Sequence, residues 1–367
     1  MKNKGFTLIE LLAVIVILAV IALIATPLIM GTITKAKRNA IKDTAYGILK
    51  AGEQYVGEKL VESDNDYNGE TIILPNQDKL QYKGGNGITG KLKISKQGDL
   101  ALQIHNNQFC VLKNFDDNEI TLTNYDIDSC KLVEPVSFEK DSWEMISQTV
   151  QENPTFYSVG SEKEITLTGE YTGTYTLRVA NNTTPDECKQ EGFSQTACGF
   201  VIEFKDIITN EKINSSNTNQ GGWPAMPLHT ILNKNIYNSL PESLKNVIKN
   251  TKVISSHGLQ DVNNLSSVDK LYLLATKEVW GKDGSKNPIN YDTSDTNTRQ
   301  LDYYKNKGVT TDNYYVAVKQ YNSLNEDWWL RSANSNSKTH FFRVTSPGEW
   351  SSHYPYDANG IAPAFRL

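Results

Sequence analysis

The chain has 367 residues, with 37 Lys and Arg against 42 Asp and Glu and a formal net charge of −5. A chain of this length has room for two compact domains. Binding to nucleic acid needs a concentrated basic surface, and no Lys- and Arg-rich patch follows Lys42, so we expect no nucleic acid partner. The apolar residues are concentrated in one run, Phe6–Met30, and the rest of the chain is polar and rich in Asn, Ser, Thr and Tyr.

The apolar run is long enough to cross a membrane. No charged residue occurs from Leu11 to Thr34, and a helix over this segment would be about 36 Å long, against about 30 Å for a bilayer core. The run is too long for a secretory signal peptide, which has a shorter apolar core that is followed by a small-residue cleavage site. A plain membrane anchor does not explain Glu10, because a carboxylate within an apolar segment costs free energy in lipid.

The segment Lys4-Gly5-Phe6-Thr7-Leu8-Ile9-Glu10 closely resembles the prepilin cleavage motif of the type IV pilin family. The resemblance implies that a prepilin peptidase cuts after Gly5 and methylates the new amino group of Phe6. It also implies that Glu10 pairs with the N-terminus of a neighbouring subunit, since a buried charge is tolerated only beside an opposite one. Pro27 lies where pilins commonly carry a proline that kinks or melts the helix locally.

Beyond the apolar run, the apolar residues recur at helical spacing and predict an amphipathic helix that continues to about Ser63. From about Ile72 the pattern changes to short alternating segments separated by turn signals, which predicts a sheet. The candidate strands are Thr71–Leu74, Lys91–Ser95, Leu100–His105, Gln108–Leu112 and Glu119–Asn124. The pilin resemblance implies that the lower half of the helix is buried against this sheet.

The four cysteines are Cys110, Cys130, Cys188 and Cys198. An even number in an exported protein predicts two disulfides, and the sequence alone allows three connectivities. Pairing 110 with 130 and 188 with 198 would close a loop within one domain in each case. A zinc site is the weaker alternative, because the chain has no Cys-x-x-Cys and no His at ligand spacing nearby.

One short segment resembles part of a calcium loop. Asp64, Asp66 and Asn68 follow the spacing of its first half, but Pro75 occupies the position where the loop needs a bidentate glutamate. We interpret the segment as a polar turn and expect neither a metal nor a cofactor.

The chain continues well beyond the predicted pilin head, with a boundary at Glu134-Pro135. In this second part, the apolar segment Asp269–Leu274 predicts a buried strand. Its motifs include Gly221-Gly222-Trp223 before a helix pair, Trp329-Leu330-Arg331-Ser332, and a closing Gly-x-x-Pro-Ala-x-x-Leu. This set resembles an uncharacterised domain of Gram-positive surface proteins over about Ser137–Leu367. It resembles C-type-lectin-like and formylglycine-generating-enzyme-like folds more loosely. The commoner pattern has an arginine where this chain has His229. If that arginine packs against or pairs with another group in relatives, the sequence leaves open whether His229 does the same.

We expect no enzymatic activity, because the sequence lacks a Gly-x-Ser-x-Gly elbow, a Cys–His nucleophile pair, paired His ligands and a phosphate loop. Aromatic rings and arginines are common at recognition surfaces. The candidate ligand-binding residues are Trp350, Tyr354 and Tyr356, in a predicted exposed loop at 346–356, together with Trp328 and Arg331. The competing interpretation buries one of the adjacent tryptophans, because neighbours on a strand point to opposite faces, and places Arg331 in a buried ion pair.

We therefore predict an α+β protein, in which a type IV pilin fold with a long N-terminal helix packed on an antiparallel sheet precedes a second α+β domain. A C-type-lectin-like fold is one candidate for that domain. The expected domains are a prepilin leader at 1–5, a transmembrane and assembly helix at 6–30, a pilin head at 31–135 and a surface-exposed domain at 136–367.

The expected function is that of a minor or tip subunit of a type IV pilus that displays its C-terminal domain for adhesion to a host surface or glycan. The expected partners are other pilin subunits and the prepilin peptidase. The chain would cross the cytoplasmic membrane once before assembly and lie in an extracellular pilus afterwards. The alternatives are a pseudopilin of a type II secretion or DNA-uptake system and a structural cap without a ligand.

Overall fold

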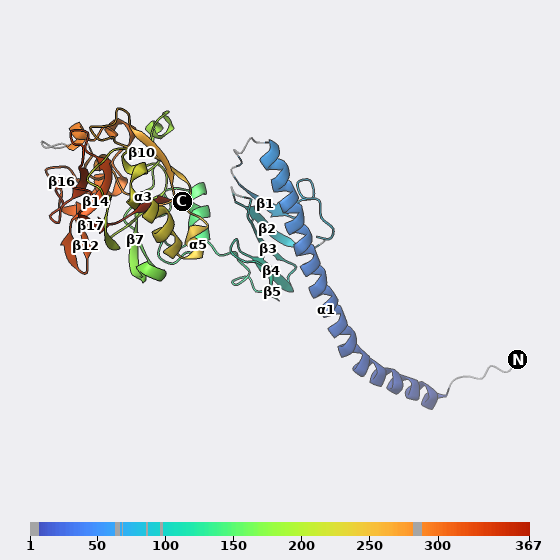
Figure 1. Ribbon diagram of the computed structural model, residues 1–367. Helices are drawn as coiled ribbons and strands as arrows, with labels where there is room; N and C mark the ends of the chain where they lie inside the picture. The colour runs from blue at the N-terminus through green and yellow to red at the C-terminus, as the bar shows by residue number, and fades with distance from the viewer. Residues whose placement is uncertain (1–6, 63–66, 68, 86, 96–97, 282–287) are drawn as a thin grey trace. The chain divides into compact units, whose positions relative to one another are not determined.

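The computed structural model describes residues 7–62, 67, 69–85, 87–95, 98–281 and 288–367. The chain divides into two compact units, which we call unit 1 (Met1–Glu134) and unit 2 (Pro135–Leu367). Figure 1 shows the elements of each unit.

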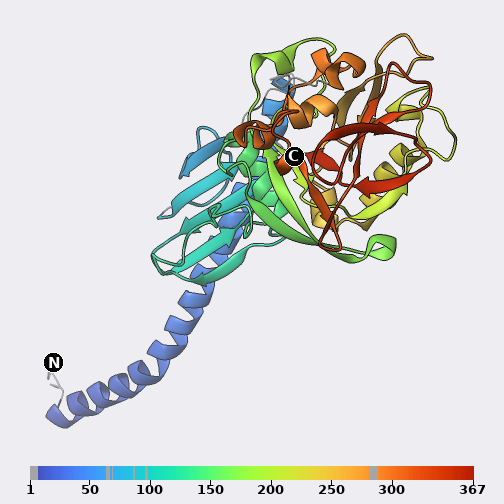
Figure 2. The same ribbon diagram turned by 90° about the vertical axis from the view of Figure 1, so that its left-hand side faces the viewer.

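Unit 1 begins with one long helix, α1 (Leu8–Glu62), whose end agrees with the prediction. The helix is continuous through Pro27, so the proline does not melt it. Figures 1 and 2 show instead that the N-terminal half of α1 bends and extends beyond the sheet of unit 1. A bend without a break is the expected response to a missing backbone donor.

The sheet of unit 1 is a five-stranded antiparallel meander in the order β1-β2-β3-β4-β5. Its strands are β1 (Glu70–Leu74), β2 (Thr89–Ile94), β3 (Leu100–His105), β4 (Phe109–Lys113) and β5 (Thr121–Asn124). All five predicted strands are present, with bounds that shift by two residues or fewer.

The C-terminal half of α1 lies along one face of this sheet (Figures 1 and 2). Ile41, Ala45 and Ile48 recur at helical spacing and are fully buried. Gly52 allows a close approach of helix and sheet, because a Cβ atom at this position would lie only 2.9 Å from Cδ2 of Leu92 on β2. The helix therefore supplies one wall of the core of unit 1.

The structure contains two disulfides, Cys110–Cys130 and Cys188–Cys198, with Cα–Cα distances of 5.8 and 5.9 Å. The first joins β4 to the segment that follows β5. The second closes a ten-residue loop in unit 2. Each disulfide therefore lies within one unit.

The described residues of unit 2 form two larger sheets and two hairpins. The five-stranded sheet has the order β16-β15-β14-β17-β9, with one parallel pair between β14 and β17, and the four-stranded sheet has the order β18-β8-β7-β6. The strands are β6 (Glu162–Leu167), β7 (Gly173–Asn181), β8 (Val201–Phe204), β9 (Thr209–Lys212), β10 (Thr251–Ser255), β11 (Leu265–Asp269), β12 (Lys319–Tyr321), β13 (Leu324–Glu326), β14 (Trp328–Ala333), β15 (Phe341–Val344), β16 (Trp350–His353), β17 (Ala358–Ile361) and β18 (Ala364–Arg366).

The helices of unit 2 are short. The α-helices are α2 (Trp143–Glu152), α3 (Pro227–Thr230), α4 (Tyr237–Ser239), α5 (Glu242–Lys245), α6 (Thr276–Trp280) and α7 (Asp302–Asn306), and the π-helix η4 (Ile231–Ile236) joins α3 to α4. The 3-10 helices are η1 (Gly169–Tyr171), η2 (Asp186–Lys189), η3 (Trp223–Ala225), η5 (Pro288–Tyr291), η6 (Asp295–Asn297) and η7 (Tyr315–Ala317). The predicted α+β class is confirmed.

Two local predictions for unit 2 are wrong. The buried segment after Asp269 is not a strand, because its β-pairing is an isolated bridge, in which Tyr272 and Ala364 exchange hydrogen bonds of 3.0 and 2.8 Å. The segment at 346–356 is not entirely a loop, because Trp350–His353 forms the edge strand β16 along β15. Both differences depend on partner strands that are distant in the sequence.

Candidate functional site

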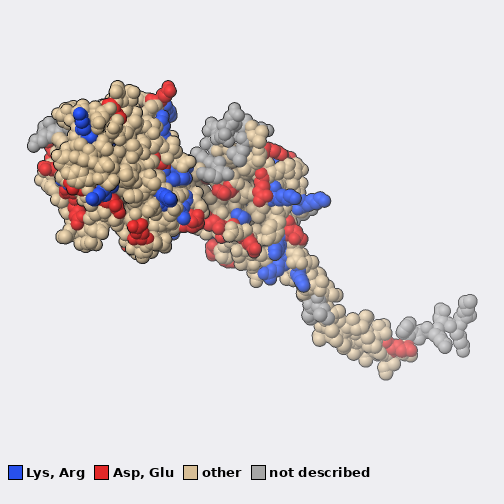
Figure 3. All heavy atoms as spheres, viewed as in Figure 1, with Lys and Arg blue, Asp and Glu red and all other residues tan. Residues whose placement is uncertain are grey.

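The N-terminal half of α1 exposes its apolar side chains. Leu8, Leu12, Ile15, Leu18 and Leu23 are each more than half exposed. By length and composition, α1 is the one described helix that is suited to cross a membrane. In Figure 3 the described side chains in this part of the helix are tan apart from one acidic group near its N-terminal end. The first basic residue after the apolar run is Lys35.

Glu10 closes a capping box at the start of α1. Its Oε2 accepts hydrogen bonds of 2.9 Å from the backbone N–H of Thr7 and 2.8 Å from the Thr7 hydroxyl, and the N–H of Glu10 donates to Thr7 Oγ1 at 3.3 Å. Among the described residues, Glu10 Oε1 accepts no hydrogen bond. One carboxylate oxygen thus stabilises the helix start, and the side chain as a whole is exposed in this chain.

Several predicted residues lie outside the described part of the chain. These are Gly5 and Phe6 of the cleavage motif and Asp64, Asp66 and Asn68 of the polar turn. The assembly role of Glu10 concerns a contact between subunits and stays a prediction. Within the residues that the structure describes, no group of three or more His, Cys, Asp or Glu side chains is placed to hold a metal ion.

Three aromatic rings on unit 2 form a surface cluster that we call the aromatic stack: His340, Tyr354 and Tyr356. The rings of Tyr354 and Tyr356 are nearly parallel, at 14°, with centroids 5.4 Å apart, and the His340 ring lies 4.4 Å from that of Tyr354. The two tyrosines are 37% and 36% exposed. They present a prearranged aromatic surface to solvent.

Polar contacts hold the inner end of the aromatic stack in place. Nδ1 of His340 lies 2.8 Å from the Ser337 hydroxyl and 2.9 Å from that of Thr339. Burial lowers the pKa of His340, and the nearby His353 lowers it further. His353 in turn pairs with Asp357 at 2.8 Å. The stack is therefore fixed by its neighbours as well as by ring packing.

The other candidate ligand residues divide into two groups. Trp350 is half-buried on β16, with its ring 6.2 Å from that of Phe342. Trp328 and Arg331 are fully buried, so the prediction that they contact a surface ligand is wrong. Both lie on β14, a central strand that has side chains packed against both of its faces, and Trp329 beside them is buried as well.

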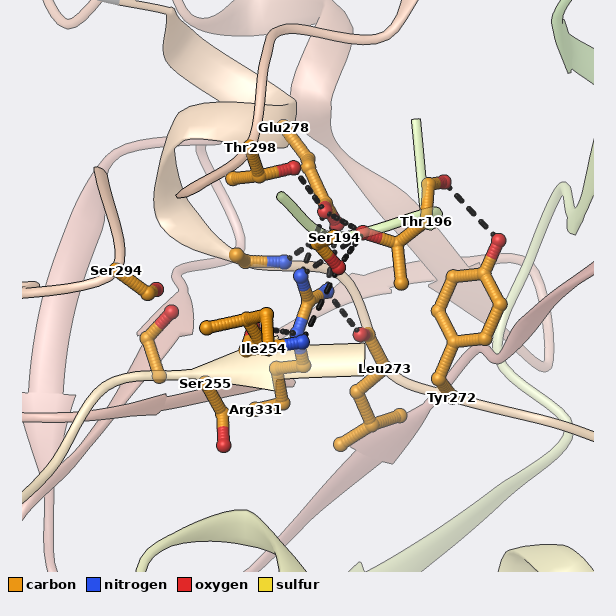
Figure 4. A network of polar contacts seen from close by, with 12 residues as sticks. Ser194, Thr196, Ile254, Ser255, Tyr272, Leu273, Glu278, Ser294, Thr298 and Arg331 are labelled. Carbon is orange, nitrogen blue, oxygen red and sulfur yellow. Dashed lines mark hydrogen bonds and ion pairs between the residues drawn. The ribbon is translucent and has the colours of Figure 1, made fainter. Parts of the chain in front are cut away.

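Arg331 belongs to a buried polar network around Glu278 of α6 (Figure 4). Its guanidinium donates two hydrogen bonds of 2.6 Å to the two carboxylate oxygens, and a third of 2.7 Å to the Leu273 carbonyl. The hydroxyls of Thr196 and Thr298 also donate to Glu278. Burial opposes ionisation of Glu278, but the Arg331 charge outweighs it and lowers the pKa of this carboxyl. The network is internal and structural.

A second buried network surrounds Glu203 of β8. Arg178 and Lys319 approach its carboxylate at 2.7 and 2.9 Å, and the Tyr304 hydroxyl donates to it at 2.9 Å. Burial disfavours the charge, but the two cations overcome this effect and hold the pKa of Glu203 at about 2. Because all four groups are buried, they form a structural tie between strands rather than a reactive site.

The structure also shows what His229 contacts. Its Nε2 lies 2.8 Å from Oδ1 of the buried Asp269, and Trp223 Nε1 donates to Oδ2 of the same carboxylate at 2.9 Å. His229 therefore pairs with an acidic group, as the arginine of the commoner pattern would be able to do. The contact ties the Gly-Gly-Trp segment to the end of β11.

Two family models match this chain. The model described as the prokaryotic N-terminal methylation motif matches residues 1–26, and the model of a domain of unknown function, DUF6273, matches residues 200–367. No curated protein and no solved structure matches the chain.

The first match, together with the long exposed apolar helix, supports a type IV pilin-like or pseudopilin-type protein. It is consistent with a membrane-anchored precursor, processing by a prepilin peptidase and assembly with other pilin subunits. The second match shows that the C-terminal part resembles an uncharacterised domain, so its function and its likeness to lectin folds stay predictions.

Sequence reasoning identified Tyr354 and Tyr356 but not the ring that supports them. The ring of His340 comes from the start of β15 and reaches the tyrosines through tertiary folding alone. Sequence reasoning also missed a polar groove that three distant segments of unit 2 form together. No local motif marks either feature.

Proposed function

We propose that this protein is a minor or tip subunit of a type IV pilus that displays unit 2 as an adhesive module. The observation that carries the proposal is the combination, in one chain, of an N-terminal methylation motif and a second compact unit that is larger than the first. A low-copy or tip position suits such a subunit, because a bulky second unit must be accommodated outside the helical core of the filament.

The aromatic stack supports the adhesive part of the proposal. Exposed tyrosines supply a large contact area, and a ring that is already held in place loses little conformational freedom on binding. Tyr354 is held between His340 and Tyr356. The stack also lies at the edge of a sheet, where its rings are accessible.

Assembly is tested with Glu10→Ala in cells that produce the filament. We expect the variant to reach the membrane but to be lost from sheared filaments, because it lacks the carboxylate that would pair with a neighbouring N-terminus. Glu53→Ala is the matched control, since Glu53 is an exposed carboxylate on the other half of α1. Normal incorporation of the Glu10 variant would contradict the assembly role.

Copy number is tested by immunogold labelling of filaments with an antibody against unit 2. We expect sparse or terminal labelling. Even labelling along whole filaments at the abundance of a major subunit would contradict the minor or tip position. Filaments that stay within the cell envelope would favour the pseudopilin alternative.

Adhesion is tested with filaments from the wild type and from the double variant Tyr354→Ala/Tyr356→Ala on glycan, matrix-protein and host-cell panels. Loss of two aromatic anchors is expected to weaken binding about tenfold or more. Phe156→Ala is the control, because Phe156 is an aromatic residue of unit 2 that is 41% exposed and outside the stack. If wild-type filaments bind nothing on any panel, the structural cap without a ligand becomes the better interpretation.

A further inference from the structure

A polar groove lies on unit 2 away from the residues of the aromatic stack. Three segments line it: 174–176 of β7, 206–208 after β8, and 320–323 at the β12–β13 hairpin. Its volume is about 370 Å³, within the range of about 300–1,000 Å³ that is usual for small-molecule sites. Figure 1 labels two of the contributing elements, β7 and β12.

Hydrogen bonds between the segments hold the walls of the groove in place. The N–H of Gln320 donates to Asp206 Oδ1 at 2.9 Å, and the N–H of Ile207 donates to the Gln320 carbonyl at 2.9 Å. Beneath them, the buried Lys319 ammonium donates to the carbonyls of Phe204 and Lys205 at 2.6 and 3.1 Å. The groove is therefore formed before any ligand arrives, which lowers the entropic cost of binding.

The tip of the hairpin carries an unusual residue. Asn322 and Ser323 join β12 to β13 and have φ angles of 51° and 66°. A two-residue turn with both φ angles positive favours Asn-Gly, because glycine adopts the left-handed region without steric cost. Ser323 bears a side chain at a position where glycine would be more stable, and this residue lines the groove. Backbone strain of this kind is typical of ligand sites.

The lining indicates the chemical class of ligand. It includes two tyrosines, Tyr175 and Tyr321, one acidic residue, Asp206, and residues with hydroxyl and amide side chains. None of the described residues that line the groove is Lys, Arg or His, which disfavours an anionic ligand, and one carboxylate is too few for a metal site. Among the described residues, Asp206 Oδ2 accepts no hydrogen bond and is available to a ligand hydroxyl.

We propose that this groove binds a neutral saccharide. Ring hydroxyls would hydrogen-bond to Asp206 and Ser323, and the apolar C–H face of the sugar would pack on the tyrosine rings. The groove is a second recognition site, and it does not depend on the aromatic stack or on the position of the protein in a filament.

The test uses the full-length protein in detergent micelles and the methyl glycosides of glucose, galactose, mannose and N-acetylglucosamine, with ligand-observed NMR and titration as readouts. We expect at least one glycoside to bind. Asp206→Asn should weaken that binding tenfold or more, since the asparagine Oδ1 still accepts from the Gln320 N–H but the carboxylate charge is lost. Absence of binding by all four glycosides would overturn the proposal.

Ser323→Gly separates a binding role from a structural one. Glycine relieves the positive φ angle, so the variant should melt at a higher temperature and yet bind the glycoside more weakly by threefold or more. The control Phe156→Ala, at an exposed aromatic residue outside both the groove and the aromatic stack, should bind as the wild type does. If Tyr354→Ala/Tyr356→Ala loses the glycoside while Asp206→Asn and Ser323→Gly retain it, the sugar binds at the aromatic stack and the groove proposal is wrong.

Discussion

Replacing Arg331 with methionine tests the energetics of the buried network in unit 2. Methionine retains most of the apolar stem of Arg331 but removes the guanidinium that donates two hydrogen bonds of 2.6 Å to Glu278. Glu278 is fully buried, and among the described residues its remaining donors would be neutral, namely the hydroxyls of Thr196 and Thr298 and the N–H of Ala275. The variant therefore leaves an uncompensated charge in the core.

Breaking one side of a buried ion pair costs about 3–5 kcal/mol. We expect Arg331→Met to lower the free energy of unfolding of unit 2 by this amount. The double variant Arg331→Met/Glu278→Gln removes the stranded charge as well, so it should be more stable than the single variant by about 1–3 kcal/mol. A recovery of this kind would distinguish an electrostatic cost from a simple loss of packing.

Urea unfolding of the full-length protein followed by tryptophan fluorescence provides the assay. All the tryptophans lie in unit 2, so the signal reports on that unit alone: Trp143, Trp223, Trp280, Trp328, Trp329 and Trp350. The control is Lys205→Met, which breaks a half-exposed pair with Glu162 and should cost less than about 1 kcal/mol. If Arg331→Met costs no more than Lys205→Met, the reasoning about this network is refuted.

Three further predictions concern unit 2. The pKa of Glu203 is about 2 in the folded protein, against an ordinary value of 4.5. The ionised carboxylate therefore stabilises unit 2 above about pH 4.5, and this stabilisation is lost as the pH falls toward 2. Melting curves should show that the free energy of unfolding falls by on the order of 3 kcal/mol over that pH range. Replacing both Cys188 and Cys198 with serine removes a ten-residue loop closure and should cost about 2–3 kcal/mol in urea unfolding; an unchanged midpoint would contradict this. His229→Ala should destabilise unit 2 by about 1–3 kcal/mol, because Asp269 loses a partner, whereas His229→Arg should retain most of the stability; equal losses would show that the pairing is unimportant.

The fold of unit 1 was predictable from the sequence to a large extent. The period of the apolar residues in α1 and the turn signals between β1 and β5 are local patterns, and the elements in the structure follow them closely. In unit 2 the same approach missed β16 and assigned a strand to the segment that contains Tyr272. Edge strands and isolated bridges depend on partners that are far away in the chain, so a local pattern does not determine them.

The candidate ligand residues show the same limit. Trp328, Arg331, Tyr354 and Tyr356 are all aromatic or cationic residues of the kind that recognition surfaces favour. Only the two tyrosines are exposed. Trp328 and Arg331 lie on β14, where other parts of unit 2 pack on both faces of the strand, whereas the tyrosines lie in the segment after β16, which is packed on one side only. Residue type alone therefore did not separate a surface anchor from a core residue.

The sequence by itself determined the N-terminus of this protein: a methylation motif, a carboxylate at Glu10 and an apolar helix long enough for a membrane. These are properties of one continuous segment, and they need no tertiary contact to be recognised. The tertiary structure alone decided that Arg331 pairs with Glu278, 53 residues away, and that Asp206 and Ser323 line one groove. Such sites arise when separate segments pack together, and the packing depends on the whole core rather than on any local pattern.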